Sequence, residues 1–180
     1  MPDALRLSLR LFDAEPAHPP GAQLWLGGAT DLSTRTLGDG PPRWLLIADH
    51  EPNQAPPPAE RAPLLAWETE QINPGDRASP DHAGGVILVS MNIDPAHEDE
   101  FNDWYNMEHI PHFNRLAGVI AARRFRAIMG NPRYVALYHV ESTDIYATPG
   151  WVAANQTPWI LRMRRFQRDR TYFMFRQRIA

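Results

Sequence analysis

The sequence lacks two residue types altogether, cysteine and lysine, so all eighteen of its permanently cationic side chains are arginines. Without cysteine the chain forms no disulfide, Cys-ligated zinc site, iron–sulfur cluster or thiolate nucleophile. Without lysine it has no Schiff-base chemistry with carbonyl substrates or pyridoxal phosphate, and no P-loop or kinase lysine. Any chemistry must therefore come from His, Asp, Glu, Tyr, Ser, Thr or Arg, or from a bound cofactor.

Long apolar runs are also missing. Residues 1–12 alternate leucine with arginine and serine where a signal peptide needs an unbroken apolar segment, and no stretch approaches the length of a membrane span. With 180 residues, of which 43% are hydrophobic, the chain is long enough for one ordinary domain or two small ones. We therefore expect a globular, cytoplasmic protein that does not associate with membranes.

Negative and positive charges are unevenly divided along the chain. Residues 115–180 contain twelve of the eighteen arginines but only three acids, and residues 1–114 contain the other eighteen acids. One interpretation is that the two parts pair within the fold or across a dimer; the functional one is a basic pocket for an acidic ligand. A nucleic-acid partner is disfavoured, because the net charge is −3 and no run of arginines is long.

Composition changes near residue 83. Thirteen of the eighteen prolines lie before this point, and fourteen of the eighteen aromatic residues lie after it. We therefore predict a β-rich, proline-rich region over residues 1–82 and a second domain over residues 83–180. In the first region, apolar alternation and turn residues predict strands at 5–12, 23–26 and 43–48, a helix at 59–72 and a linker at 73–85.

The second domain has a more regular order of elements. Asp94 and Pro95 are a typical N-cap and first residue of a helix, which we expect to end near Ile110 because Pro111 disfavours helical geometry in the residue before it. Thr157 is the N-cap of a restarted second helical region. The predicted order is strand 86–93, helix 95–110, strands 119–128 and 134–141, helical region 143–166 and strand 171–179. This order is βαββαβ, an α+β ferredoxin-like plait.

The first helix of this domain carries most of the candidate chemistry. On a period of 3.6 residues, aromatic and ionisable side chains share one broad stripe, namely Phe101, Trp104, Tyr105, Glu108, His109 and His112. His109 is the candidate catalytic residue, because an imidazole both accepts and returns a proton near neutral pH. Tyr105 and Glu108 are candidates to orient it or to share in catalysis. The structural alternative for His109 is a helix-end histidine that bonds the last carbonyl groups.

Five side chains are candidates for binding a substrate: Trp104, His112, Arg123, Arg124 and Tyr138. Arg123 and Arg124 are adjacent on a predicted strand, so they point to opposite faces of the sheet and only one faces the helices. An arginine there would hold a carboxylate or an enolate, or else pair with the acidic helix. Tyr138 and His139 are likewise adjacent on the next predicted strand, so only one of them faces the helices. The spacings H-x-H and H-E-x-x-H, typical of metal sites, do not occur, and we predict no metal.

These motifs resemble a known family. The pattern Glu-Phe-x-x-Trp-Tyr-Asn-x-Glu-His-Ile-Pro at 100–111, the Gly-Val and Ala-Arg-Arg-Phe segments after it and Gln-Thr-Pro-Trp at 156–159 are similar to the dimeric α/β-barrel superfamily, and most to its EthD-like proteins. The resemblance covers about residues 85–180. It implies a four-stranded antiparallel sheet with two helices on one face, paired with a second sheet into a barrel, and a pocket between sheet and helices. The strands of residues 1–82 fit a degenerate first copy of the same plait.

The superfamily includes cofactor-free isomerases, polyketide cyclases, small-quinol monooxygenases and haem-binding or haem-degrading proteins, in several of which a pocket histidine transfers protons. The resemblance gives this role to His109. Because the superfamily is functionally diverse, the shared fold does not fix the reaction. Our first hypothesis is a cofactor-independent enzyme of isomerase, cyclase or lyase type that acts on a small apolar carbonyl-bearing or aromatic metabolite. We expect a homodimer, because residues 1–82 show no counterpart of the candidate helix.

Two alternative functions stay open. The first is a haem-binding or monooxygenase-type protein, in which His109, His112 or His139 is the axial ligand of a haem. The second is a non-catalytic ligand-binding accessory protein of a catabolic pathway, whose polar stripe recognises a ligand without converting it.

Overall fold

The computed structural model describes residues 4–58 and 60–177. Their strands are β1 (Arg6–Phe12), β2 (Gln23–Asp31), β3 (Thr36–Leu37), β4 (Arg43–His50), β5 (Leu65–Asn73), β6 (Gly85–Ile93), β7 (Val119–Met129), β8 (Tyr134–Val140) and β9 (Gln167–Gln177). Their helices are η1 (Pro95–His97), α1 (Glu98–Trp104), η2 (Tyr105–His109), α2 (Ile110–Phe113), η3 (Thr143–Ala147), α3 (Pro149–Ala154) and α4 (Pro158–Met163). None of these helices is long and apolar enough to cross a membrane.

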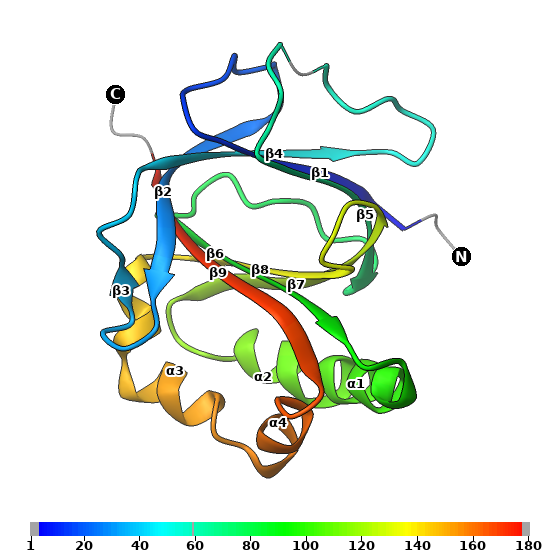
Figure 1. Cartoon of the computed structure of the whole chain (residues 1–180), viewed down its shortest axis with the longest axis vertical. Coiled ribbons are helices and arrows are strands. Elements are labelled where there is room, and N and C mark those ends of the chain that lie inside the picture. Colours follow the sequence, from blue (N-terminus) through cyan, green and yellow to red (C-terminus); the bar gives the residue numbers. More distant parts are fainter. Residues whose placement is uncertain (1–3, 59, 178–180) are drawn as a thin grey trace.

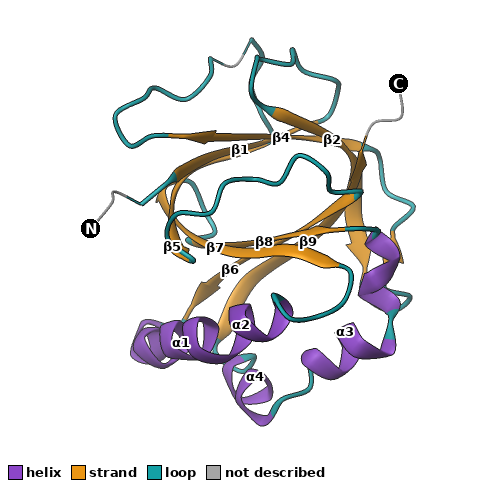
Figure 2. Ribbon diagram, turned by 180° about the vertical axis from the view of Figure 1, so that it is seen from behind, coloured by secondary structure: helices purple, strands orange, loops and turns teal. Residues whose placement is uncertain are grey.

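The strands form an antiparallel sheet that closes into a barrel within one chain (Figure 1). The strand order is β3-β2-β4-β1-β5-β7-β8-β6-β9, and β2 also pairs with β9, so the two ends of the sheet meet. Figure 2 shows the two groups of strands facing each other, with α1, α2, α3 and α4 outside the group of β6 to β9. The predicted α+β ferredoxin-like barrel is confirmed, but residues 1–82 close it in place of a second chain.

The first half of the chain repeats the strand order of the second. In the sheet, the strands of the second half lie in the order β7-β8-β6-β9, and those of the first half lie in the order β2-β4-β1-β5. In each half, the strand that comes first in the sequence therefore lies third in the sheet, between the third and the fourth strands of that half. Where the second half has helices, the described residues of the first half have the loops 13–22 and 51–64. The described part of the first half therefore has the strand order of the plait without its helices. It lacks a counterpart of the candidate helix, as expected, but it still completes the barrel, so this absence no longer argues for a homodimer. Dimerisation itself stays a prediction.

Alternation along the strands builds two separate cores. On β6, Val86 and Leu88 point into the barrel, whereas Ile87, Val89 and Met91 point toward the helices. Leucines from β1, Trp25 and Trp67 fill the barrel interior. The core between sheet and helices is rich in aromatic residues, which include Phe101, Trp104, Tyr105, Phe113, Tyr138, Tyr146 and Trp151. Of the candidate catalytic side chains, Tyr105 belongs to this core and His109 packs against its aromatic rings.

Two predicted caps are confirmed, and one predicted helix is wrong. Asp94 accepts a hydrogen bond from the N–H of Ala96, and Thr157 accepts one from the N–H of Ile160. The predicted helix at 59–72 is replaced by β5, on which burial alternates with Trp67 inside; residue 59 lies outside the described residues. The glutamate and glutamine residues of this segment favour a helix, but β1 and β7 offer pairing partners on both sides, which outweighs that preference. The last strand begins at Gln167, and residues 178 and 179 of its predicted span also lie outside the described part.

Closure of the barrel depends on a glycine, which gives a first prediction. A Cβ atom at Gly27 would lie 1.9 Å from the carbonyl oxygen of Met174 on β9, whereas one at Gly28 would have 3.6 Å of room. We expect Gly27→Ala to lower the free energy of unfolding by about 2–3 kcal/mol, because the paired strands must move apart. The matched Gly28→Ala variant is expected to change it by less than about 1 kcal/mol. Urea unfolding measures both, and equal losses in the two variants would contradict this account of closure.

Candidate functional site

The helix that holds His109 contains a π-helical turn. The chain stays helical from α1 through η2 and α2 to Phe113, and the N–H of Ile110 bonds the carbonyl of Tyr105, five residues back. The predicted helix end near Ile110 is therefore wrong. Pro111 lacks an N–H and its ring disturbs a regular helix, and the wider turn accommodates it without ending the helix. Such turns occur frequently at functional sites.

His109 lies on the inner side of this turn and is only 6% exposed. Its Nε2 atom is 2.8 Å from the hydroxyl oxygen of Tyr138 on β8. The rings of Trp104, Tyr105 and Phe113 surround the imidazole, with centroids 4.6, 4.8 and 4.6 Å away. The sequence-predicted His109, Tyr105, Trp104 and Tyr138 are thus brought together by the fold.

Burial controls the protonation of these groups. Desolvation, followed by the positive charges of Arg164 and Arg124, lowers the pKa of His109 from its ordinary value of 6.5 to about 3. Burial also raises the pKa of Tyr105 and of Tyr138 well above the ordinary value. At neutral pH the imidazole of His109 and the phenols of Tyr105 and Tyr138 are therefore uncharged.

These side chains line a small pocket between the sheet and the helices. Its volume is about 40 Å³, enough for a few water molecules, and its other walls include Trp151, Ile160 and Tyr172. Tyr146 and Arg164 border this pocket and also a second cavity of about 240 Å³. Because small-molecule sites usually measure roughly 300 Å³ or more, a ligand in the aromatic pocket must extend into the second cavity.

Glu108 and His112 lie elsewhere than the sequence suggested. One carboxylate oxygen of Glu108 accepts hydrogen bonds from the indole N–H of Trp104 at 3.2 Å and from the hydroxyl of Thr157 at 2.6 Å. Glu108 therefore fixes the pocket wall and the start of α4 without contacting His109. His112 is exposed and does not line the pocket.

Arg124 is the member of the arginine pair that faces the helices. It is fully buried, and its guanidinium carbon lies 4.4 Å from the ring centroid of Tyr105. It donates hydrogen bonds to the side-chain oxygens of Asn102 at 2.7 Å and Asn106 at 3.3 Å. Tyr105 stands between Arg124 and the pocket, so Arg124 anchors α1 to the sheet and does not line the pocket.

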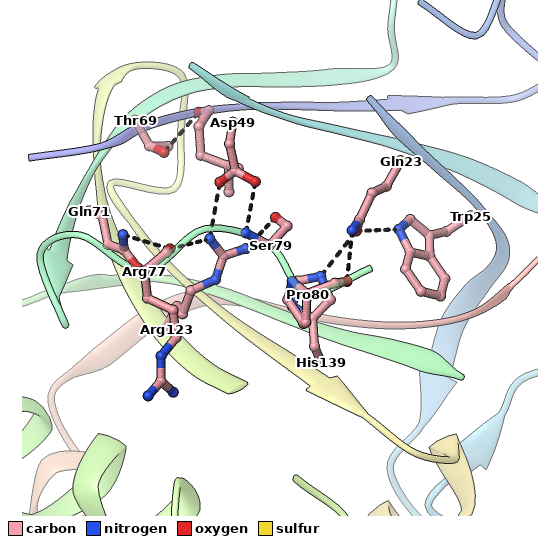
Figure 3. A network of polar contacts seen from close by, with 11 residues as sticks. Gln23, Trp25, Asp49, Thr69, Gln71, Arg77, Ser79, Pro80, Arg123 and His139 are labelled. Atoms are coloured by element: carbon pink, nitrogen blue, oxygen red, sulfur yellow. Dashed lines mark hydrogen bonds and ion pairs between the residues drawn. The ribbon is translucent and has the colours of Figure 1, made fainter. Parts of the chain in front are cut away.

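Arg123 and His139 point to the opposite face, into the barrel (Figure 3). Arg123 donates to a carboxylate oxygen of Asp49 at 3.1 Å, to the carbonyl of Arg77 at 2.9 Å and to the hydroxyl of Ser79 at 2.6 Å. These contacts hold the linker that joins β5 to β6. His139 lies 3.2 Å from the side-chain oxygen of Gln23, and burial lowers its pKa to about 3.

Sequence reasoning missed several residues that border the pocket. Trp151 on α3, Tyr146 on η3, Tyr172 on β9 and Arg164 after α4 all contribute to it. They come from separate short elements with no common spacing. The available signals were the enrichment of aromatic residues after residue 83 and of arginines after residue 114.

The histidines considered as haem ligands do not fit a haem. The pocket beside His109 is about 40 Å³ in volume, and its Nε2 atom is engaged by Tyr138. His139 is fully buried in the barrel interior, and His112 lies outside the pocket. In residues 4–58 and 60–177, no three His, Asp or Glu side chains come together in a way that would hold a metal ion.

Comparison with known proteins supports the fold. A model of a domain of unknown function, DUF4286, matches residues 86–155, which is less than half of the chain. The search of curated proteins finds no match.

Several solved structures share the fold at low sequence identity. One is an uncharacterised ferredoxin-fold protein from Listeria monocytogenes related to antibiotic biosynthesis monooxygenases, with a TM-score of 0.57 and 11% identity over 98% of this chain and 97% of that one. A haem-degrading enzyme from Listeria monocytogenes gives a TM-score of 0.56 and 9% identity over 96% and 99%. A major regulator of staphylococcal pathogenesis gives 0.56 and 9% over 97% and 99%. The fold therefore spans nearly the whole chain, including residues 1–82.

The buried histidines give a second prediction. His109 and His139 are neutral in the folded protein, but in the unfolded chain they take up a proton below their ordinary pKa of 6.5. Their contribution to stability is therefore complete above pH 6.5 and is lost as the pH falls from 6.5 toward 3. Between pH 6 and 4, we expect the free energy of unfolding of His109→Asn to fall less steeply than that of the wild type, by about 1 kcal/mol per pH unit. Urea titrations at three pH values test this, and parallel curves would refute it.

Proposed function

We propose that the protein is an enzyme that transfers a proton to or from a small aromatic or carbonyl-bearing metabolite without a bound cofactor, with His109 as the base. The observation that carries the proposal is a neutral imidazole, 2.8 Å from the Tyr138 hydroxyl, on the wall of an aromatic pocket. Flat apolar walls suit an aromatic ring, and His109 and Tyr138 are polar groups on those walls. The resemblance of residues 100–111 to EthD-like proteins favours the same role for His109.

The low pKa of His109 shapes the mechanism. A protonated imidazole is unfavourable in the empty pocket, because burial and two arginines oppose its charge. An enolate or phenolate formed beside it would offset that charge, so the proton moves only when the substrate becomes an anion. The Tyr138 phenol is placed to donate a hydrogen bond to the anion or to the imidazole.

A third prediction tests this proposal with a neutral probe, phenylacetone. The methylene protons between its ring and carbonyl exchange with D₂O when a base removes them, and ¹H NMR follows their loss. We expect the wild type to accelerate exchange and His109→Asn to lower the enzymatic rate at least 100-fold. The control is Tyr134→Phe. Tyr134 is buried on β8, the strand of Tyr138, but its hydroxyl donates a hydrogen bond to Glu98 outside the pocket. Exchange that is unaffected in His109→Asn would rule out His109 as the base.

A monooxygenase is the second candidate function. It is supported by the fold shared with a protein related to antibiotic biosynthesis monooxygenases and with a haem-degrading enzyme. Since the histidines do not fit a haem, the version that suits this pocket starts with the same proton transfer. Removal of a phenolic proton by His109 would make a bound hydroquinone easier for molecular oxygen to oxidise. One oxygen atom would then enter the ring to give a hydroxyquinone, the other would leave as water, and the hydroquinone itself would supply the electrons.

Oxygen uptake provides a fourth prediction. If the second candidate is correct, the protein consumes oxygen with 1,4-dihydroxynaphthalene faster than buffer alone, and His109→Asn removes the increase. An oxygen electrode, with catalase present to correct for peroxide, measures the rate. Uptake equal to that of buffer would eliminate the monooxygenase candidate, whereas phenylacetone exchange would still support the acid–base enzyme.

A further inference from the structure

The second cavity, at the mouth of the aromatic pocket, is lined by three arginines. Arg35, Arg164 and Arg170 border its volume of about 240 Å³, and none of its described lining residues is acidic. Tyr146 and Tyr172 belong to both cavities, so the cavity continues the pocket that holds His109. The arginines come from three places in the chain: the turn between β2 and β3, the end of α4, and β9.

Neighbouring arginines behave differently. Arg162 pairs with Glu100 at 2.7 Å, and Arg168 pairs with Asp94 at 2.9 Å. These pairs follow the expectation that the acidic and basic parts of the chain neutralise each other. The three arginines of the second cavity, like several others of the described chain, form no ion pair with any described residue.

The hydrogen bonds of these arginines leave most of their donors available. Arg164 donates a hydrogen bond to the side-chain oxygen of Asn155, and Arg170 donates one to the side-chain oxygen of Gln167. Both bonds are long, at 3.5 Å. The guanidinium of Arg35 lies over the ring of Tyr146, 5.9 Å from its centroid. Burial and the positive charges of Arg170 and Arg35 lower the pKa of Arg164, so the cluster is unfavourable without an anion.

The nearest acids in sequence are already engaged. A carboxylate oxygen of Asp31 accepts hydrogen bonds from the backbone and hydroxyl of Ser33, which shapes the turn that carries Arg35. The carboxylate of Asp169, next to Arg170, accepts from Asn92. Neither acid therefore neutralises the cluster.

The backbone is unusual beside two of the arginines. Arg35 itself has a φ of 59°, and Asp169, which precedes Arg170, has a φ of 51°. Residues other than glycine seldom adopt this left-handed conformation, which costs on the order of 1 kcal/mol. The turn between β2 and β3 and the start of β9 thus each retain an unfavourable backbone conformation next to an arginine that borders this cavity.

We propose that this cavity is an anion subsite, in which Arg35, Arg164 and Arg170 bind a carboxylate or phosphate group of the substrate. Guanidinium groups bind both anions through paired hydrogen bonds. The inference rests on the proposed function, because it specifies the other end of the ligand whose ring lies beside His109. The substrate is then a small aromatic or cyclic acid, with the reacting carbon between the ring and the anion.

A fifth prediction compares three probes of similar shape: phenylacetate, phenyl phosphate and the neutral phenylacetamide. Trp104 and Trp151 line the pocket, so tryptophan fluorescence reports binding. We expect at least one anion to bind tenfold or more tightly than phenylacetamide, and the tighter anion identifies the group. Raising the salt concentration should weaken binding of the anion but not of the amide.

Variants assign this preference to the arginines. Arg35→Gln and Arg164→Gln should each reduce the preference for the anion about tenfold. Arg168→Gln is the matched control, since Arg168 lies on β9 two residues from Arg170 but pairs with Asp94. Equal affinities for the three probes, binding of none of them, or an unchanged preference in both Arg35→Gln and Arg164→Gln would overturn the subsite.

The two proposals fail in different ways. His109→Asn should keep the preference for the anion while it loses phenylacetone exchange. If exchange requires His109 but the preference for the anion is unchanged in the Arg35→Gln and Arg164→Gln variants, the subsite is wrong and the proposed function stands. If the arginines control anion binding but the wild type exchanges no protons, the subsite is supported as a binding site and the proton-transfer function is wrong.

Discussion

The pairing of β2 with β9 is the interaction on which the rest of the structure depends, because it joins the last described strand to the first half and completes the barrel in one chain. With β5 paired to β7 on the other side, the β6–β9 group has partners at both of its edges. The interior side chains of the first half then support this group from within. The first half can therefore keep loops where the second has helices, and the aromatic pocket develops on one side only.

Alternation on β7 and β8 separates two polar systems by the thickness of one sheet. Arg124 and Tyr138 face the helices, whereas Arg123 and His139 face the barrel and the linker. Both histidines, His109 and His139, are neutral because both are buried, yet one borders a cavity and the other is enclosed by protein. Perturbed protonation alone therefore does not identify a functional histidine, and the adjoining pocket is what distinguishes His109.

Much of the second half was predictable from its sequence because its signals are local. Asp94 and Thr157 specify the helix starts, and strand alternation gives the plait. The π-helical turn around His109 was not predictable from Pro111, since a proline ends some helices and deforms others. The segment that forms β5 was wrongly predicted as a helix, because its residues favour helices locally. Hydrogen bonding to β1 and β7 stabilises the strand more than this local preference stabilises a helix. Arg35 and Arg164, 129 positions apart in the sequence, meet only through the closed barrel.

The linker between β5 and β6 has a further consequence for how the chain folds. It lies between the two groups of strands, held by Arg123 and by the side chain of Gln23 on Pro80. If one group of strands unfolded, the other would lose the partners of its edge strands and the side chains that fill the barrel interior. The change of composition near residue 83 therefore does not separate two units that unfold independently. We expect both halves to unfold in a single two-state transition, and to refold slowly, because the ordering of the linker and the barrel seam β2–β9 requires contacts between residues far apart in the chain.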